Sequence, residues 1–519
     1  MAEIRKTMSV CPVCLKRIPA SILEEDGKIF IEKECKEHGK VKEVYWSDAA
    51  LYKKFESFNE NGVHVTNPSV EVKKGCPWDC GLCDAHESQT LLGLIDVTNR
   101  CNLKCHYCFA NAAVAGYIYE PSFDEVLGML DNLRAQKPLP VLGVMFSGGE
   151  PLVREDFVDI VKETWARGFT QILVATNGIM LVKKPGLAKQ LQEAGVATLY
   201  MKFNGTTPDT NIENHEYMEQ IIEECRKAGL MVTLVPTIIK GFNDHQIGDI
   251  VKFAADNIDV VRGVNFQPIS FCGQMSDTEK EAQRITIPDL FDLLDEQTGG
   301  AINKGTCLPV PCMVPFSKLA KRMTGREQFR LSAHPHCGAG SYLFKTKEGL
   351  VSITEFLDVE QFLKDLDEVS EGEGEMGKLE KLALLNKVRK IVKKNVIKEK
   401  VPNKLPIEML LVNILLAKAE FLPKFHMQTL FVGTMHFQDP YNLDMARLRK
   451  CVIHYAAPDG RIIPFCAYNN LGYRDEIEKK FAKHVNREMM EKKGPNAADL
   501  KAEAEKAAGA VSEKEAEKA

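Results

Sequence analysis

The chain has 519 residues, of which 45% are hydrophobic and 27% charged, with a formal net charge of −5. This length predicts two to four domains, and the absence of a basic excess argues against nucleic acid as a partner. The segment MAEIRKTMSV lacks the apolar core of a signal peptide, and no apolar run reaches the roughly 18 residues of a membrane span, so we expect a cytoplasmic protein.

Sixteen cysteines occur in the chain, and many of them stand in tight groups. Disulfide frameworks belong to short secreted domains, whereas clustered cysteines in a cytosolic chain more often bind metal. We therefore interpret the cysteine groups as metal ligands.

Residues 1–70 are predicted to form a small metal-binding knuckle domain. Cys11 and Cys14 open it as CPVC, and Cys35 and His38 follow in CKEHGK. Three thiolates and one imidazole at this spacing suit one tetrahedral mononuclear zinc or iron ion.

Residues 71–90 contain CPWDCGLC, with Cys76, Cys80 and Cys83 as a second group of thiols. The group precedes the first strand of the next region, so it does not lie on a strand-end loop of that region. We expect it to hold an auxiliary iron–sulfur cluster whose fourth ligand comes from elsewhere in the chain. The alternatives are a second mononuclear site or a part of the N-terminal one.

Residues 91–300 alternate strand-like and helix-like stretches and predict an α/β domain of six β-α units. The sheet is expected either to stay open and doubly wound or to curl into a partial barrel. The expected strands are 91–98, 139–147, 170–178, 196–205, 230–239 and 264–271, and amphipathic helices are expected at 122–136, 154–168, 215–229 and 246–257.

Two motifs fall at the carboxyl ends of the first two strands, where parallel sheets place functional loops. Cys101, Cys105 and Cys108 form CNLKCHYC, and three such thiolates can ligate three irons of a [4Fe–4S] cluster, leaving the fourth open. An open iron can chelate the amino and carboxylate groups of S-adenosylmethionine (SAM). The second strand ends in SGGEP, from Ser147 through Gly148 and Gly149 to Glu150 and Pro151. Its glycines permit close approach of backbone to a ligand, and Glu150 could neutralise the methionyl ammonium.

CNLKCHYC followed by Phe109, with GGEP one strand later, resembles the radical SAM superfamily. The resemblance implies a partial (β/α)6 barrel, a cluster-bound SAM and a 5′-deoxyadenosyl radical that abstracts a hydrogen atom. It also implies that Phe109 contacts SAM and that four strand-end residues contact its ribose and adenine, namely Thr176, Asn177, Lys202 and Asn204. The alternative, a ferredoxin-like electron carrier, would explain neither GGEP nor the six β-α units.

Residues 301–486 break the β-α rhythm and are expected to form a C-terminal domain for auxiliary clusters and substrate. Its candidate ligands are Cys312, Cys337, Cys451 and Cys466, and a PDG turn is expected to bring the last two together. Cys225 is predicted to be a buried small hydrophobe, and Cys272 suits either role. Residues 487–519 are predicted to be a solvated or disordered tail.

The layout of residues 8–475 resembles the archaeal tetraether lipid synthases, through CPVC, CPWDCGLC, HPHCGAGSYL and GTMHFQDPYNLDMARLRKCVIHY. The resemblance implies a transferase that joins terminal methyl carbons of archaeal diether lipids to give tetraether or macrocyclic products. It further implies two to three [4Fe–4S] clusters, SAM, one mononuclear metal and a reductant such as ferredoxin. The fourth strand ends in YMKFNG, where the resemblance leads us to expect an acidic residue, as in YLQFDG, at the position of Asn204. This departure argues against a SAM-binding role for Asn204.

A radical SAM methylase of pterin cofactor biosynthesis is the alternative function. Peptide maturation and multi-cluster electron transfer are two further hypotheses, and the sequence shows no evident peptide-recognition domain for the first. Residues 407–437 are apolar and suit a lipid tunnel or a peripheral membrane contact through Lys418 and Lys424, or else a core helix followed by a buried strand.

Overall fold

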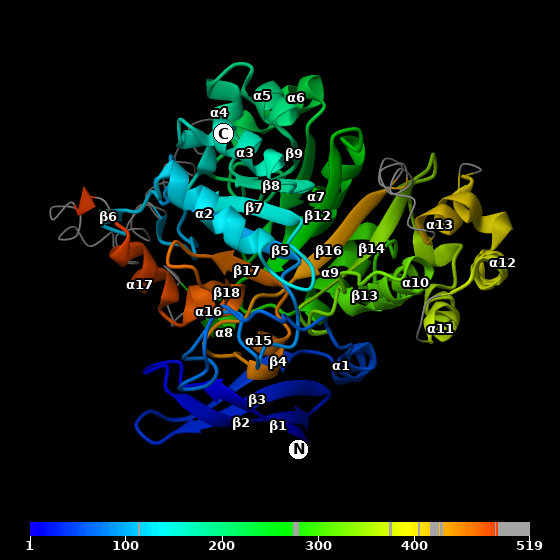
Figure 1. The fold of residues 1–519 in the computed structure, drawn as a ribbon, viewed down its shortest axis with the longest axis horizontal. Coiled ribbons are helices and arrows are strands. Elements are labelled where there is room, and N and C mark those ends of the chain that lie inside the picture. Colours follow the sequence, from blue (N-terminus) through cyan, green and yellow to red (C-terminus); the bar gives the residue numbers. More distant parts are fainter. Residues whose placement is uncertain are drawn as a thin grey trace, which may run out of the picture.

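The computed structural model describes residues 1–112, 115–272, 280–372, 376–402, 405–415, 425, 429–482 and 484–485. Figure 1 shows a small sheet at the N-terminal end (blue), a large twisted sheet covered by helices, and a cluster of helices (yellow) to one side. The expected tail, 487–519, and the expected headgroup contacts Lys418 and Lys424 lie outside the described residues.

The N-terminal unit is an antiparallel sheet followed by one helix. Its strands are β1 (Ala2–Val10), β2 (Arg17–Glu25), β3 (Lys28–Cys35) and β4 (Gly39–Trp46), paired in that order. Alternate residues of β3 are buried, as a sheet with one covered face requires. Helix α1 (Ala49–Glu56) begins at Asp48, whose side chain accepts a hydrogen bond from the Leu51 amide.

The predicted six-stranded parallel barrel is confirmed. Neighbouring strands pair in parallel in sequence order, and most are buried on both faces. The strands are β5 (Leu92–Thr98), β7 (Gly143–Gly148), β8 (Gln171–Thr176), β9 (Val196–Lys202), β10 (Met231–Val235) and β12 (Val261–Pro268), with the short β11 (Thr237–Ile238) beside β12.

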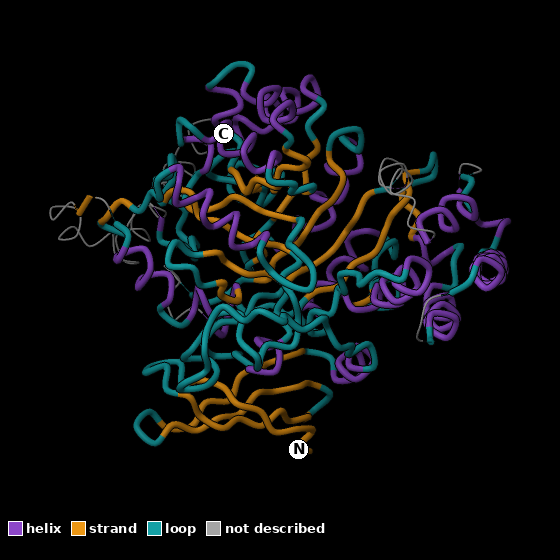
Figure 2. The backbone as a smooth tube through the Cα atoms, in the orientation of Figure 1, coloured by secondary structure: helices purple, strands orange, loops and turns teal. Residues whose placement is uncertain are grey.

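Amphipathic helices connect these strands and cover the outer face of the sheet, as Figure 2 shows in purple. They are α2 (Phe123–Arg134), α3 (Phe157–Ala166), α4 (Ile179–Lys183), α5 (Leu187–Ala194), α6 (Met218–Ala228), α7 (Ile247–Asp256) and α9 (Ile287–Thr298). Ser122 and Glu125 form a capping box at the start of α2.

The expected C-terminal domain contributes strands to both edges of the barrel sheet. Strand β16 (Leu430–Met435) pairs in parallel with β12, and β17 (Ile453–Ala456) pairs in parallel with β5. Residues 436–452, here called the strap, therefore run from the carboxyl end of β16 to the amino end of β17. The strap contains α15 (Met445–Arg449).

Four further strands extend the sheet beyond these edges. They are β13 (Leu308–Pro309), β14 (Gly338–Lys345), β15 (Leu350–Ser352) and β18 (Ile462–Pro464). Strand β18 pairs antiparallel with β17, which confirms the predicted PDG turn. A separate two-stranded ribbon joins β6 (Tyr117–Ile118) to β19 (His484–Val485).

The remaining helices lie in the C-terminal half of the chain. One group, with its own apolar core, is α10 (Val314–Thr324), α11 (Val359–Ser370), α12 (Lys378–Asn395) and α13 (Ile407–Leu415). The others are α8 (Lys280–Gln283), α16 (Phe465–Asn470) and α17 (Tyr473–Lys480). Within 407–437, the described α13 and β16 match the expected core helix and buried strand. No helix among the described residues has the length and apolar character to cross a bilayer.

Candidate active site and metal centres

A cavity of about 280 Å³ opens at the carboxyl ends of the barrel strands. Cys101, Cys105 and Cys108 line it from the loop that follows β5. Burial raises the pKa of the Cys101 thiol to about 11 and that of Cys105 to about 12, because a lone thiolate would lose its hydration there. A bound metal reverses that preference, so this set of donors fits an iron–sulfur cluster.

The two glycines at the end of β7, Gly148 and Gly149, are required because backbone atoms leave no space for a side chain. Gly148 has φ +125°, and a Cβ there would lie 2.1 Å from the Thr98 carbonyl oxygen. A Cβ on Gly149 would lie 2.2 Å from the carbonyl oxygen of Arg100. The Gly149 amide donates to the Thr98 carbonyl oxygen (2.7 Å) and the Glu150 amide to that of Arg100 (2.9 Å), so the GGEP segment lies directly against the chain that leads into the Cys101 loop.

Glu150 is buried and oriented by three donors. Its carboxylate accepts hydrogen bonds from the Leu152 amide (3.0 Å), the Thr176 hydroxyl (2.7 Å) and the Asn177 amide (2.8 Å). Burial nevertheless raises the pKa of Glu150 to about 7. Thr176 and Asn177 therefore join the GGEP segment to β8, and all three residues line the cavity.

Of the two candidates at the end of β9, Lys202 lines the cavity and Asn204 does not. The Lys202 ammonium lines the cavity and donates to the Tyr107 hydroxyl (2.8 Å), with Glu213 at 3.4 Å. The Asn204 amide donates to the same Tyr107 hydroxyl and accepts from the backbone amide of Thr237 (3.0 Å). Asn204 is not among the described residues that line the cavity, so its structural role is to connect the Cys105 loop to β11.

The opposite wall of the cavity is aromatic, with a few polar side chains. Asn265 and Gln267 lie two positions apart on β12, and no hydrogen-bond partner is described for either side-chain amide. Aromatic and apolar residues that also line the cavity are Tyr200, Met435, Phe437, Ile453, Tyr455 and Phe465. Nothing in the periodicity of the sequence distinguishes these amides from ordinary strand residues.

Phe109 is held between the cavity and a buried arginine. Its ring lies 5.7 Å from that of Phe465, and the Arg474 guanidinium lies 5.9 Å from its centre. Arg474 also donates to Asp96 and to the Glu478 carboxylate (2.8 Å). Asp96 in turn accepts a hydrogen bond from the Ser147 hydroxyl (2.6 Å). Arg474 of α17 therefore contacts Phe109, which follows CNLKCHYC, and is linked through Asp96 to Ser147 of SGGEP.

The predicted mononuclear centre is assembled in the N-terminal unit. The ligand atoms of Cys11, Cys14, Cys35 and His38 all lie within 4.8 Å of one another. The Cys14 and Cys35 sulfurs are 3.9 Å apart, and the His38 Nδ1 is 3.5 Å from the Cys35 sulfur. A tetrahedral ion with metal–sulfur distances of about 2.3 Å needs edges of about 3.8 Å, so the geometry fits one ion.

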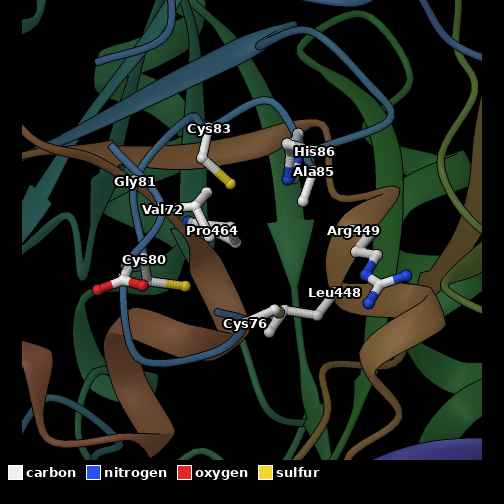
Figure 3. Close-up of a pocket in the computed structure, with 11 residues that line it drawn as sticks. Val72, Cys76, Cys80, Gly81, Cys83, Ala85, His86, Leu448, Arg449 and Pro464 are labelled. Carbon is white, nitrogen blue, oxygen red and sulfur yellow. The ribbon is translucent and has the colours of Figure 1, made fainter. Parts of the chain in front are cut away.

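Cys76, Cys80 and Cys83 surround a small cavity in front of the strap, with His86 and Arg449 on its far side (Figure 3). Asp79 folds this loop by accepting hydrogen bonds from the amides of Lys73 (2.8 Å) and Gly75 (2.7 Å). The three thiols are not among the described groups compact enough for a single ion. Their wider arrangement fits a polynuclear cluster better than the alternative of a second mononuclear site.

The C-terminal cysteines divide into two sets. Burial chiefly raises the thiol pKa values of Cys451 and Cys466, and neighbouring thiols add to the rise: Cys466 and Cys337 act on Cys451, and Cys337 acts on Cys466. Cys451 also contributes to raising the pKa of Cys80, after burial. Burial chiefly raises the pKa of the Cys272 thiol to about 12, and Cys466 adds to the rise, which makes Cys272 a further candidate for this set. Sequence reasoning left Cys272 undecided, since an isolated cysteine carries no spacing signal.

Cys312 does not belong to this group. It lies before α10 and packs against the apolar cluster of α10–α13, and no described contact joins it to another thiol. Burial alone raises its pKa to about 12. Cys312 therefore has no thiol neighbour among the described residues, and its role as a cluster ligand stays a prediction. Cys225 is buried on α6, as predicted.

Two family models match the chain. Residues 95–254 match the model described as the radical SAM superfamily. Residues 3–47 match the model described as the HMPTM N-terminal zinc ribbon domain. The first match covers the barrel strands β5 to β10, and the second covers the Cys11, Cys14, Cys35 and His38 centre.

Curated relatives extend the likeness along the chain. The 7,8-dihydro-6-hydroxymethylpterin dimethyltransferase of Methanocaldococcus jannaschii is 44% identical over 489 residues, which are 92% of this chain and 96% of the relative. A GTP 3′,8-cyclase of Clostridium acetobutylicum is 32% identical over 182 residues, 34% of this chain and 56% of the cyclase. A solved methyltransferase of Kitasatospora setae, TsrM, aligns with a TM-score of 0.25 and 13% identity over 47% of this chain and 46% of that chain, too slight a likeness to carry an argument.

Proposed function

We propose that this chain, which belongs to the radical SAM family that includes the 7,8-dihydro-6-hydroxymethylpterin dimethyltransferase of M. jannaschii, adds methyl groups to a dihydropterin. The observation that carries the proposal is the 44% identity, which runs through the zinc ribbon, the barrel and the C-terminal region alike. A relative that aligned with the barrel alone would support an inference about SAM chemistry, but it would not support an inference about the substrate.

The expected tetraether lipid synthase function is overturned by the same relative. That protein is named for pterin methylation, and its alignment covers the motifs on which the lipid resemblance rested. Archaeal diether lipid is accordingly withdrawn as the expected substrate, and the alternative, a radical SAM methylase, takes its place.

The aromatic and amide side chains that line the cavity are suited to a flat heteroaromatic ligand. Tyr200, Phe437 and Tyr455 offer ring faces or edges for stacking, and Asn265 and Gln267 offer amides that both donate and accept hydrogen bonds. A pterin ring needs both kinds of contact. Two phytanyl chains would cover these cavity-lining amides without offering them hydrogen-bond partners, which is costly.

We assign the cofactor sites as follows. Cys101, Cys105 and Cys108 would hold the cluster that binds SAM, and Glu150 would receive the methionyl ammonium beside Ser147 and Thr176. When bound, the cluster and SAM would supply the hydrogen-abstracting radical of the superfamily. The barrel keeps water away from the reacting atoms and orients the substrate ring.

The other thiols would hold auxiliary clusters. Cys76, Cys80 and Cys83 would form one set, and Cys272, Cys337, Cys451 and Cys466 would form the other. A one-electron reductant such as ferredoxin completes the proposal as a partner.

The test is an anaerobic reaction of the cluster-loaded enzyme with SAM, a strong reductant and 7,8-dihydro-6-hydroxymethylpterin. We expect pterin products heavier by one and two methyl groups, together with 5′-deoxyadenosine, and neither from Cys105→Ala. SAM with a deuterated methyl group shows by mass whether SAM is the methyl donor. Formation of 5′-deoxyadenosine with an unchanged pterin would refute the substrate.

A further inference from the structure

Glu56, His334 and His336 form a second group of metal-ligand side chains, and none of the three belongs to the cysteine centres described above, although His336 directly precedes Cys337 in the chain. Glu56 ends α1, and the two histidines precede β14, so the group joins the N-terminal unit to the C-terminal region. One ligand atom from each of the three side chains lies within 4.8 Å of the others. His334 and His336 stand in HPHCGAGSYL, but Glu56 is far from them in sequence, so no spacing pattern connects the three.

The hydrogen bonds of His336 determine which ring nitrogen is free. Its Nε2 lies 3.1 Å from the backbone carbonyl oxygen of Tyr52, so Nε2 carries the proton and donates it. The lone pair of the neutral ring is then on Nδ1. That atom is fully buried and has no hydrogen-bond partner among the described residues.

Nδ1 of His336 faces an acceptor rather than a donor. The Oε2 atom of Glu56 lies 3.7 Å away and is likewise buried without a described partner, while Oε1 accepts from the Asn59 amide (2.9 Å). Two lone pairs that face each other in a buried site repel each other. A cation between them removes this repulsion and satisfies both atoms.

His334 supplies the third donor. The His336 backbone amide points at the Nδ1 atom of His334 from 3.4 Å, which is beyond the usual range for a hydrogen bond. The lone pair of that nitrogen therefore accepts only a weak hydrogen bond. The two imidazole rings have their centres 5.1 Å apart. Both histidines are buried.

The aromatic surroundings hold His336 in this orientation. Its ring stacks on Tyr52 at 4.0 Å with an interplanar angle of 10°, and the Trp46 ring meets it edge to face at 4.9 Å. A ring fixed by packing and by a hydrogen bond from its other nitrogen is the usual form of a metal-ligating histidine. Glu56 is 38% exposed, which provides a route for an ion to enter.

We propose that Glu56, His334 and His336 bind one divalent transition-metal ion, zinc or ferrous iron. Two imidazoles and one carboxylate are a donor set that both ions accept, with a further position left for water. The ion would fasten α1 to the segment before β14, and so would fix the N-terminal unit against the barrel. This site is distinct from the centre of Cys11, Cys14, Cys35 and His38.

Metal stoichiometry tests the proposal. Cluster-loaded protein, whose cluster thiols are occupied, is stripped of loosely held ions, saturated with zinc and desalted, and zinc per chain is measured by mass spectrometry. We expect Glu56→Ala to bind one zinc fewer per chain than the unchanged protein. The matched control is Glu360→Ala, which removes an exposed carboxylate paired with Lys54 beside the same helix and should lose none.

A second measurement distinguishes loss of the metal site from misfolding of the variant. Zinc should raise the melting temperature of the unchanged protein and of Glu360→Ala by more than it raises that of Glu56→Ala, while the circular dichroism of all three stays the same. His336→Ala should lose the same zinc equivalent. Equal zinc content in Glu56→Ala and the unchanged protein would overturn the proposal and leave a buried histidine packed on Tyr52, with or without a proton shared with Glu56.

Discussion

Met435 and Ile453 stand at opposite edges of the six-stranded barrel, and both side chains line its cavity. Met435 ends β16 beside β12, and Ile453 begins β17 beside β5. The strap connects them, and Phe437 near its start also faces the cavity. One continuous C-terminal segment therefore completes the wall that the partial barrel leaves open.

The glycines of GGEP should tolerate no side chain. Gly148→Ala and Gly149→Ala would each place a methyl group against a backbone carbonyl, and we expect a loss of at least about 2 kcal/mol of stability together with loss of SAM binding. The matched control is Gly128→Ala, on an exposed position of α2 with nothing within 4 Å of the added carbon, which should stabilise the helix by about 1 kcal/mol. Urea unfolding midpoints measure both effects, and equal midpoints for Gly149→Ala and Gly128→Ala would show that the loop can rearrange.

The two amides on β12 should control substrate binding without affecting SAM. We expect Asn265→Leu and Gln267→Met, which keep side-chain size, to raise the KM for dihydropterin by ten- to a hundred-fold, or about 1.5–3 kcal/mol. Gln190→Met, on the exposed face of α5, should change nothing. Unchanged KM with normal methylation would place pterin recognition elsewhere, whereas absence of methylation in the unchanged protein would refute the proposed function itself.

SAM affinity should depend on pH through Glu150. Burial holds the pKa of this carboxyl near 7, so the acid is increasingly protonated below that pH and offers less charge to an ammonium ligand. We expect the affinity of the cluster-loaded enzyme for SAM to fall by about ten-fold for each unit below pH 7 and to level off above it. Glu150→Gln should bind more weakly throughout and show no such slope between pH 6 and 8 in anaerobic calorimetry.

Asp365 should contribute stability that acid removes. Hydrogen bonds from Lys394 (2.8 Å), Asn395 (2.9 Å) and Gln361 (2.7 Å) lower the pKa of Asp365 to about 2. A lowered folded-state pKa gives stability that is complete above the unfolded value near 4 and is lost as the pH falls toward 2. The size is about 1 kcal/mol, because Lys394 is largely exposed and screened by solvent.

Asp365→Asn tests this expectation. Its unfolding midpoint should be lower than that of the unchanged protein at pH 7, and the difference should shrink between pH 4 and 2. A difference that stays constant with pH would mean that packing of α11 on α12, rather than charge, causes the loss.

The sequence predicted the barrel because each of its units has a local signal. Buried apolar strands and amphipathic helices alternate, and all six expected strands and four expected helices are present. The two flanking strands could not be predicted in the same way. Whether β17 pairs with β5 depends on contacts between segments far apart in sequence, and residues 453–456 are too short to indicate their neighbour.

In the candidate site, too, residues with a local sequence signal could be predicted and residues that depend on distant contacts could not. Spacing identified the thiols of the Cys11, Cys76 and Cys101 groups, since their ligands lie close together in sequence. Cys272 and Cys312 stand alone, so only the fold could show that the first has a thiol neighbour and that the second packs in an apolar core. Asn204 had a strand-end position typical of SAM contacts, but Tyr107 and Thr237 occupy its amide.

The late position of β16 and β17 in the chain has a consequence for biosynthesis. As the polypeptide leaves the ribosome, β5 and β12 are complete long before the strands that pair with their outer edges have been made. Unpaired strand edges are prone to associate with other chains, so a nascent chain that stops before residue 430 carries two of them. During this interval the cavity beside Cys101 also lacks Phe465 and Tyr455 from its lining.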